Sequence, residues 1–398
     1  MKRVTTSILL LAMATAAQPQ TTISEDSGAQ PACAEPAETV CSVTLAGDFF
    51  ETSLANFDGG PAEAFEFWSA MADSGDAGAQ YLLGRMHASG EGVEQDRVEA
   101  ARLFGLAAEQ GYARAQYFLG LFLSLGVGVE EDVPEGMRLF RLAADQGLAD
   151  AQFSLALYLL EGTDVVEGIR LLHLAAEQGV PEAQINLALS YFNGEGLPPD
   201  ATEGARWMRM AAEQGDASAQ SFMGTLFAQG QGVRRNLSEA VRWFRLSADQ
   251  GFAEGQFNLG VSYLNGQGVS QDYREAARLF SLAGEQGMGG AYGNLGMIYS
   301  EGWGVPRDFG MARNLFRQGA ELGDPNSQSN LAASYLAGFG GRREPELAYM
   351  WARLAADAGH PQGRTVLEFA RQRMRAGAIR RGDRRAEDCI QSGFQDCE

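Results

Sequence analysis

A block of 36 residues recurs eight times along this chain of 398 residues. The first copy opens at Gly75, and the pattern reopens at Gly111, Gly147, Gly179, Gly215, Gly251, Gly287 and Gly323. Seven copies have 36 residues and the third has 32. A fixed period of this length is typical of a solenoid, in which each unit is too small to bury a core alone and stacks on its neighbours. The recurring residues are suited to packing and capping, so the pattern predicts an architecture rather than a catalytic site.

Each block is expected to form two helices. In the first, Gln80, Leu83, Gly84 and His87 are spaced i, i+3, i+4 and i+7, which places them on one helix face. The position of Gly84 is glycine or alanine in all eight blocks. Because glycine in a helix costs about 1 kcal/mol relative to alanine, this column of small residues predicts a close approach between helices.

A loop of the form Gly-x-Gly-Val, as at Gly90, leads into the second helix. That helix opens with Asp96 three residues before Glu99, a spacing that predicts a capping box. The same start recurs at Asp132, Asp164, Asp200, Asn236 and Asp272. An arginine follows each glutamate three residues later, as Arg102 follows Glu99, and predicts an exposed ion pair on the helix.

These residues resemble the Sel-one-like repeat family, which is related to the tetratricopeptide repeat. The resemblance lies in Ala-x-Ala-Gln-x-x-Leu-Gly-x-x-Tyr, in Gly-x-Gly-Val-x-x-Asp, and in Ala-x-x-Trp/Leu-Phe-x-x-Ala-Ala-x-Gln-Gly. It implies an all-α fold, a right-handed α-solenoid of helix-turn-helix units. The eight repeats span residues 75–110, 111–146, 147–178, 179–214, 215–250, 251–286, 287–322 and 323–358.

Half-units flank the repeats. Residues 60–74 match a second helix, and residues 359–378 match a first helix that would cap the solenoid. In that capping helix Glu368 and Arg371 replace the small and aromatic residues of the pattern, as an exposed end requires. Residues 379–398 form an arginine-rich tail that ends in two cysteines.

The N-terminus predicts export. Lys2 and Arg3 precede the apolar run Ile8 to Ala14, so residues 1–17 match a cleavable signal peptide. No cysteine follows closely enough to suggest a lipoprotein, and residues 18–59 are expected to form a flexible segment. The mature protein is therefore expected in the periplasm or the medium, without an integral membrane segment.

Four cysteines, Cys33, Cys41, Cys389 and Cys397, lie outside the repeats. Three pairings are open, and we favour Cys33 with Cys41 and Cys389 with Cys397, which would fasten the two ends in an oxidising compartment. A metal site is the weaker interpretation because no histidine lies near these cysteines.

The charge balance restricts the partners. Asp and Glu number 51 against 31 Lys and Arg, a net charge of −20, which disfavours nucleic acid as a partner. Arginines gather near the C-terminus: Arg364, Arg371, Arg373, Arg375, Arg380, Arg381, Arg384 and Arg385. They predict either a solvated tail or a docking site for an acidic partner or for the acidic body of this protein.

Catalytic signals are missing from the sequence. Lys2 is the only lysine, so the mature chain cannot supply the lysine of a P-loop, a Schiff base or a Ser-x-x-Lys site. His87, His173 and His360 have no metal-ligand spacing. We therefore predict no catalytic residue, no metal and no cofactor, although a triad assembled by the fold from distant residues leaves no sequence signal.

In the related tetratricopeptide solenoids the first helices line a concave groove. The resemblance places two residues of each first helix in that groove, namely the first and the fifth residue after the repeated glutamine. These residues are most apolar in the N-terminal half of the repeats. They are Tyr81, Arg85, Tyr117, Leu121, Phe153, Leu157, Ile185 and Leu189. The alternative is that some are buried between repeats.

A neighbouring column holds Asn186, Asn258, Asn294 and Asn330, whose amides can both donate to and accept from a peptide backbone. The alternative is that asparagine here is ordinary repeat composition.

These features predict a non-enzymatic scaffold that binds another protein or peptide of unknown identity in its groove. The protein is expected to be monomeric, with end-to-end self-association as an alternative. Exported members of the family are often regulators of sensor kinases or cell-wall enzymes, which the resemblance implies for this chain. The competing hypothesis is a cell-wall-related hydrolase of penicillin-binding type, but such relatives carry disulfides within their repeats and this chain has none there.

Overall fold

The computed structural model describes residues 60–162, 164–394 and 397. This part of the chain contains nineteen α-helices and no strand, which confirms the predicted all-α solenoid fold. None of the described helices is long and apolar enough to cross a membrane. The predicted signal peptide and N-terminal segment, with Cys33 and Cys41, lie outside the described residues.

The helices follow one another in pairs separated by short turns. In chain order they are α3 (Gly60–Asp73), α4 (Ala77–Ser89), α5 (Arg97–Glu109), α6 (Ala113–Leu125), α7 (Val133–Asp145), α8 (Ala149–Leu160), α9 (Val165–Glu177), α10 (Pro181–Asn193), α11 (Ala201–Glu213), α12 (Ala217–Gln229), α13 (Leu237–Asp249), α14 (Ala253–Asn265), α15 (Tyr273–Glu285), α16 (Gly289–Glu301), α17 (Phe309–Glu321), α18 (Pro325–Ala337), α19 (Pro345–Asp357), α20 (Pro361–Arg371) and α21 (Ala376–Gln391).

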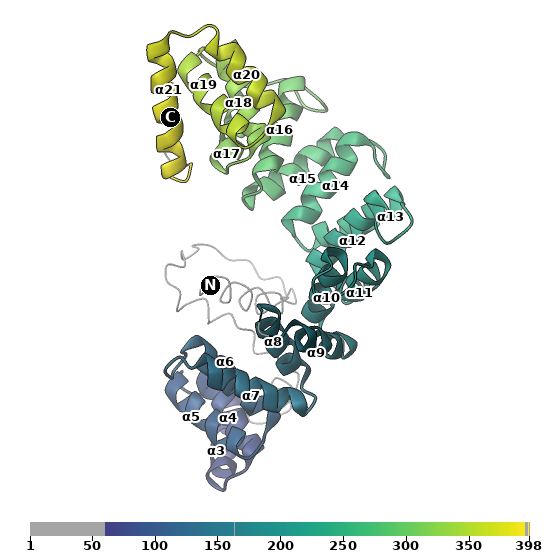
Figure 1. Cartoon of the computed structure of the whole chain (residues 1–398), viewed down its shortest axis with the longest axis vertical. Helices are drawn as coiled ribbons and strands as arrows, with labels where there is room; N and C mark the ends of the chain where they lie inside the picture. The colour runs from purple at the N-terminus through teal and green to yellow at the C-terminus, as the bar shows by residue number, and fades with distance from the viewer. Residues whose placement is uncertain (1–59, 163, 395–396, 398) are drawn as a thin grey trace. The chain divides into compact units, whose positions relative to one another are not determined.

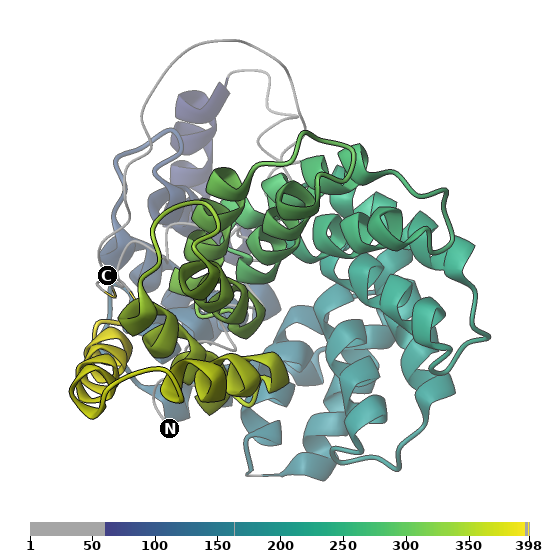
Figure 2. The same cartoon turned by 90° about the horizontal axis from the view of Figure 1, so that it is seen from above.

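The chain divides into two compact units, Met1–Ala211 and Ala212–Glu398, with the division inside α11. Consecutive helices pack together from α3 to α10 in the first unit and from α12 to α20 in the second, where α21 packs against α19 (Figure 1). In the C-terminal unit the first helices of successive repeats also touch: α12 contacts α14, α16 contacts α18, and α18 contacts α20. Figure 2 shows the helices of this unit, green to yellow, side by side from a second direction.

The column of small residues allows the two helices of a repeat to touch, as predicted. A Cβ atom added to Gly84 of α4 would lie 2.8 Å from the ring of Phe104 on α5. The same contact recurs between Gly296 and Phe316, where the distance would be 2.6 Å. The aromatic ring of the second helix therefore occupies the space that a larger side chain would need.

The loop glycines serve two purposes. Gly126, which ends α6, and Gly128 both have a φ of 66°, a left-handed conformation that favours glycine. A Cβ atom on Gly128 would also lie 2.3 Å from the carbonyl oxygen of Arg97 in the preceding repeat. The second glycine of the loop is therefore also required by close contact between repeats.

The predicted capping box forms only in part. The Asp96 carboxylate accepts hydrogen bonds from the backbone N–H groups of Val98 and Glu99, as an N-cap does. The backbone N–H of Asp96 donates to the carbonyl of His87 on the first helix. The Glu99 carboxylate is held instead by Arg102, with an N–O distance of 2.6 Å. The glutamate therefore forms the predicted ion pair and does not close the box.

The repeated glutamine connects three helices through its side chain. Nε2 of Gln116 donates to the carbonyl of Ala108 at the end of α5, and its Oε1 accepts from Gln146 at the end of α7. Gln116 itself belongs to α6 and is buried. The same pair of contacts is made by Gln80, Gln152 and Gln220, and Gln256 accepts the corresponding bond from Gln286. A buried polar side chain is tolerated here because its donor and acceptor are both used.

The arginine-rich segment expected as a tail is largely helical. It forms α21, which packs against α19 through an ion pair between Arg381 and Glu346. Asp383 of α21 accepts hydrogen bonds from Arg353 and from the hydroxyl of Tyr349. At the end of α21 the structure joins the Cys389 and Cys397 sulfurs in a disulfide, with Cα atoms 4.5 Å apart.

Candidate functional site

Several residues predicted to line an open groove are buried. Tyr81 is enclosed by the rings of Tyr112 and Phe118, with centroids 5.3 and 5.7 Å away. Arg85 is buried beside it, donates a hydrogen bond of 3.1 Å to the Tyr81 hydroxyl, and lies over the Phe118 ring. Both side chains are held inside the repeat, so neither is accessible to a partner.

The same correction applies to three more residues of the N-terminal unit. Leu121, Phe153 and Leu157 are buried within the stack of helices. They are apolar because they fill the space between successive repeats, which was the alternative explanation for their column. The prediction that they form an exposed apolar surface is wrong.

The other predicted residues of this unit are half-buried. They are Tyr117, Ile185 and Leu189. The Tyr117 ring packs against the rings of Phe118 and Phe140, and burial raises the pKa of its hydroxyl. Tyr117 is therefore mainly part of the packing between α6 and α7.

The asparagine column separates into two kinds of residue. Asn186 donates a hydrogen bond of 2.8 Å to the carbonyl of Glu182 in its own helix, and Asn258 donates to the Ser221 hydroxyl of the preceding repeat at 3.4 Å. Among the described residues, the side-chain amides of Asn294 and Asn330 have no hydrogen-bond partner. These two amides remain available to a ligand.

Whether Asn258, Asn294 and Asn330 are hydrogen-bonded depends on the residue at the facing position in the preceding repeat. Asn258 faces Ser221, which offers a hydroxyl. The corresponding residues for Asn294 and Asn330 are Phe257 and Gly293, which offer no polar side chain. The sequence could therefore have separated Asn258 from Asn294 and Asn330, but not Asn186, which faces Phe153 and bonds to its own helix.

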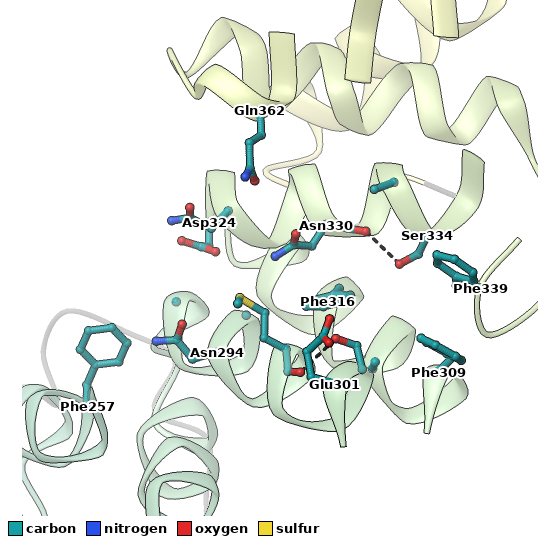
Figure 3. A pocket seen from close by; sticks show the side chains of 17 residues that line it. Phe257, Asn294, Glu301, Phe309, Phe316, Asp324, Asn330, Ser334, Phe339 and Gln362 are labelled. Atoms are coloured by element: carbon teal, nitrogen blue, oxygen red, sulfur yellow. Dashed lines mark hydrogen bonds between the residues drawn. The ribbon is translucent and has the colours of Figure 1, made fainter. Parts of the chain in front are cut away.

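Asn294 and Asn330 both line a cavity of about 750 Å³ in the C-terminal unit. Residues of α14, α16, α18 and α20 contribute to its wall, together with the start of α17 and the loop after α18. Figure 3 shows Asn330 and Ser334 on α18, and Asp324 just before this helix, above Asn294 and Glu301 on α16, with Gln362 of α20 above them. The cavity thus lies on the first helices of the last repeats.

Small residues create this cavity. Gly293 occupies the position that Tyr81, Tyr117 and Phe153 fill in earlier repeats, and Gly290 also lines the wall. A Cβ atom on Gly293 would lie 2.7 Å from the Ser327 hydroxyl, so α16 and α18 approach each other closely at its floor. Glycine in place of a large side chain marks this site, whereas the groove was predicted from large apolar residues.

Apolar side chains remain exposed around the cavity. Met297 is 38% exposed and Phe339 is 54% exposed. The Phe339 ring stacks on the ring of Phe309, with centroids 5.0 Å apart. Exposed apolar surface beside unpaired amides is typical of a binding site for a peptide or protein segment.

The charge of the cavity is negative. Glu301 and Asp324 line it, and no lysine or arginine is among its lining residues. One carboxylate oxygen of Asp324 accepts a hydrogen bond of 2.7 Å from the backbone N–H of Ser327 and so caps α18. The electrostatics favour a ligand that brings hydrogen-bond donors or a cation.

A second, smaller cavity of about 340 Å³ lies where α15 and α17 end, beside the first turn of α16. It forms where the glutamine pairing stops, because Tyr292 and Leu322 occupy the two glutamine positions. A Cβ atom on Gly284 would lie 2.8 Å from the Tyr292 ring, so the glycine makes room for it. Phe394 from the C-terminal loop lines the same cavity. Apolar packing by Phe394 therefore takes the place of the hydrogen bond between two glutamines that other repeats have.

The three histidines have structural contacts. His173 is half-buried against Tyr191 and Trp207, and burial lowers the pKa of its imidazole. His360 caps α20, and its Nε2 lies 2.8 Å from Oδ1 of Asn326. His87 packs edge-on against the Phe65 ring. Within the described residues no group of three or more His, Cys, Asp or Glu side chains could hold a metal ion.

A known family of repeats matches this chain at each of the eight repeats. The model of the Sel1 repeat matches eight times, at residues 77–112, 113–148, 149–180, 181–216, 217–252, 253–288, 290–324 and 325–360. No curated protein matches this chain.

Two solved structures are similar over most of the chain. One is c5321, a protective antigen present in uropathogenic Escherichia coli strains displaying an SLR fold, with a TM-score of 0.58 and 25% identity over 83% of this chain and 96% of that chain. The other is a Sel1 repeat protein from Oxalobacter formigenes, with a TM-score of 0.59 and 29% identity over 76% of this chain and 89% of that chain.

Proposed function

Because this chain belongs to the Sel1 repeat family, we propose that it acts by binding a protein or peptide segment in the cavity of its C-terminal unit. Sel1 repeat proteins are generally protein-interaction scaffolds without enzymatic activity. The observation that carries the proposal is the position of Asn294 and Asn330. Their unpaired amides lie on neighbouring first helices and line one cavity.

The proposed ligand is an extended segment. An asparagine amide can donate to a backbone carbonyl and accept from a backbone N–H, so two such amides on successive helices can fix the register of a peptide. Met297, Phe309 and Phe339 would bury an apolar side chain, which supplies most of the affinity. Glu301 and Asp324 would favour an arginine, a lysine or an N-terminal amine nearby.

This proposal moves the binding site from the N-terminal unit to the C-terminal unit. The asparagine part of the original prediction is kept for Asn294 and Asn330. Asn186 and Asn258 are bonded within the protein and are the natural controls.

Export is the second part of the proposal. Residues 1–17 match a signal peptide, and the structure pairs Cys389 with Cys397, an arrangement suited to an oxidising compartment. We expect the mature protein to begin after Ala16 or Ala17 and to be periplasmic or secreted. Mass spectrometry of the protein from its native host, with and without reduction, tests both the cleavage and the disulfide; an uncleaved or fully reduced chain would contradict export.

The partner is proposed to be a signalling or cell-envelope protein, in line with the exported location. The hydrolase hypothesis has less support, because the described residues provide neither a lysine nor a metal-binding group. Assay of the mature protein with a chromogenic β-lactam distinguishes the two. Turnover that copurifies with the protein and disappears on mutation would contradict a pure scaffold.

Site-specific photo-crosslinking tests the location. A photoreactive amino acid is placed at Met297, which is 38% exposed in the cavity, or at Leu246, which is 39% exposed on a second helix. We expect a discrete crosslinked partner from position 297 and none from position 246 in living cells. The same product from both positions, or a product only from position 246, would place the partner elsewhere.

A further inference from the structure

The C-terminal cap has a charge opposite to that of the rest of the chain. Between Arg364 and Arg385 there are eight arginines and only two acidic residues, whereas the whole chain has a net charge of −20. The structure places this segment on α20, on the corner that follows it, and on the first part of α21. Figure 1 shows α20 and α21, in yellow, at the end of the C-terminal unit beside α19.

Most of these arginines are not used by the fold. Arg381 is held by Glu346 of α19. The other seven are exposed and form no ion pair within the part of the chain that the structure describes; we name them the cap arginines. They are Arg364, Arg371, Arg373, Arg375, Arg380, Arg384 and Arg385. The packing of α21 on α19 therefore does not depend on ion pairs from these seven side chains.

The cap arginines lie on the exposed surface of α20, of α21 and of the corner between them. Neither of the two cavities described above is lined by any of them. Phe369 lies among them and is 45% exposed, with the Arg373 guanidinium 3.3 Å from its ring centroid. An aromatic ring exposed beside several guanidinium groups on an open surface is suited to an extended anionic surface rather than to one small anion.

The helix α21 itself is fixed. Gly382, Ala386 and Cys389 are buried, and Asp383 is bound by Arg353 and Tyr349 of α19. Its apolar face is therefore not available for insertion into a bilayer. Contact must be made by side chains on the outside of the cap.

We infer that the C-terminal cap is a docking surface for an anionic lipid bilayer. The guanidinium groups bind lipid phosphates, and Phe369 enters the headgroup region. The acidic remainder of the chain is repelled by the same surface, so only the cap can make contact. This inference does not depend on the proposed binding cavity.

A bilayer is favoured over a second copy of this chain for a geometric reason. The cap arginines are spread over α20, the corner after it and the first turns of α21, and neither cavity described above lies among them. Two copies would also bring together two strongly acidic bodies. A fluid surface of phosphates imposes neither a fixed spacing nor this repulsion.

Vesicle sedimentation of the mature protein tests the inference. The probe is a vesicle of phosphatidylcholine and phosphatidylglycerol, with pure phosphatidylcholine as reference. Binding to the anionic vesicle is expected at an ionic strength of about 0.1 M and should be lost near 1 M, as the Debye length falls from about 10 to about 3 Å. Each arginine near such a surface contributes about fivefold, so the triple variant R373Q/R375Q/R380Q should bind roughly 100-fold more weakly.

The matched control is R138Q/R170Q/R278Q, which removes the same charge from exposed arginines of second helices. This control should be repelled slightly more than wild type but should retain binding. No binding by wild type, or equal loss in both variants, would overturn the inference. A second copy of the chain would be the partner if wild type failed to bind vesicles and light scattering showed that it self-associates. That self-association would be sensitive to salt and lost only in the cap variant, and it would overturn the inference. Release by inorganic phosphate at constant ionic strength would indicate a single anion site and also overturn it.

Discussion

The side chains of Gln80 and Gln110 meet within the first repeat, where Nε2 of Gln110 donates a hydrogen bond of 2.8 Å to Oε1 of Gln80. This contact, together with the bond from Gln80 to Ala72, ties the second helix of one unit to both helices of the next. It recurs as Gln116 with Gln146, Gln152 with Gln178, Gln220 with Gln250 and Gln256 with Gln286. The repeated glutamine is therefore a connector between repeats and not a binding residue.

The last repeat lacks this contact. Ala358 stands where the partner glutamine would be, and Oε1 of Gln328 is buried with no hydrogen-bond partner among the described residues. Replacing Ala358, which is exposed, with Gln should supply the missing donor and raise the free energy of unfolding of the C-terminal unit by about 1 kcal/mol. Urea unfolding followed by hydrogen exchange in α18 and α19 measures the gain. If Ala358→Gln raised the free energy of unfolding equally in a chain that also carries Gln328→Ala, the explanation would be wrong.

Substitution of alanine for glycine should have opposite effects on stability at two positions, one inside the small-residue column and one outside it. A Cβ atom on Gly296 would lie 2.6 Å from the Phe316 ring, whereas a Cβ atom on Gly105 of α5 would meet nothing within 4 Å. Gly296→Ala should therefore lower the free energy of unfolding by about 1–3 kcal/mol, through overpacking. Gly105→Ala should raise it by about 0.5–1 kcal/mol, through helix propensity. Thermal and urea unfolding of both variants check the signs, and destabilisation by both would contradict the packing account.

His173 should make stability depend on pH. Burial lowers the pKa of its imidazole in the folded state below the ordinary value of 6.5. The unfolded chain then binds more protons as the pH falls below about 6.5, so the free energy of unfolding should decrease there and be restored above it. His173→Gln should remove this part of the pH dependence. Urea titrations between about pH 5 and 8 provide the measurement, and an unchanged profile in His173→Gln would refute the assignment.

Phe394 should hold the C-terminal loop in place. Its ring lines the small cavity that Tyr292 and Leu322 create where they replace the glutamine pair. Phe394→Ala should increase hydrogen exchange in the disulfide loop and in the last turn of α21. Ile390→Ala is the matched control, because that side chain is 52% exposed on the same helix and should have little effect. Equal effects of the two substitutions would mean that the cavity does not anchor the loop.

The helices could be predicted from the sequence because each repeat restates the same spacing. The burial of individual side chains could not. Tyr81 and Phe257 occupy equivalent positions, yet Tyr81 is enclosed by Tyr112 and Phe118, whereas Phe257 faces the cavity beside Gly290. Such differences depend on neighbours in adjacent repeats, which one column of the pattern does not show.

The helix α21 was missed for a related reason. Its sequence contains Gly377 and Gly382, which lower helix propensity, and only a short apolar face. Gly382 is needed because a Cβ atom there would lie 2.5 Å from the Tyr349 ring on α19. Tertiary contact therefore stabilises a helix that local sequence does not favour.

The most direct test of the account is the affinity of the partner captured at position 297 for three forms of the mature protein. These are wild type, N294A/N330A, and N186A/N258A, the last of which alters the two asparagines that are bonded within the protein. The account predicts that N294A/N330A weakens binding by about 10-fold or more, as expected for two lost hydrogen bonds, and that N186A/N258A binds within about threefold of wild type. Equal affinities for wild type and N294A/N330A would contradict the proposed site.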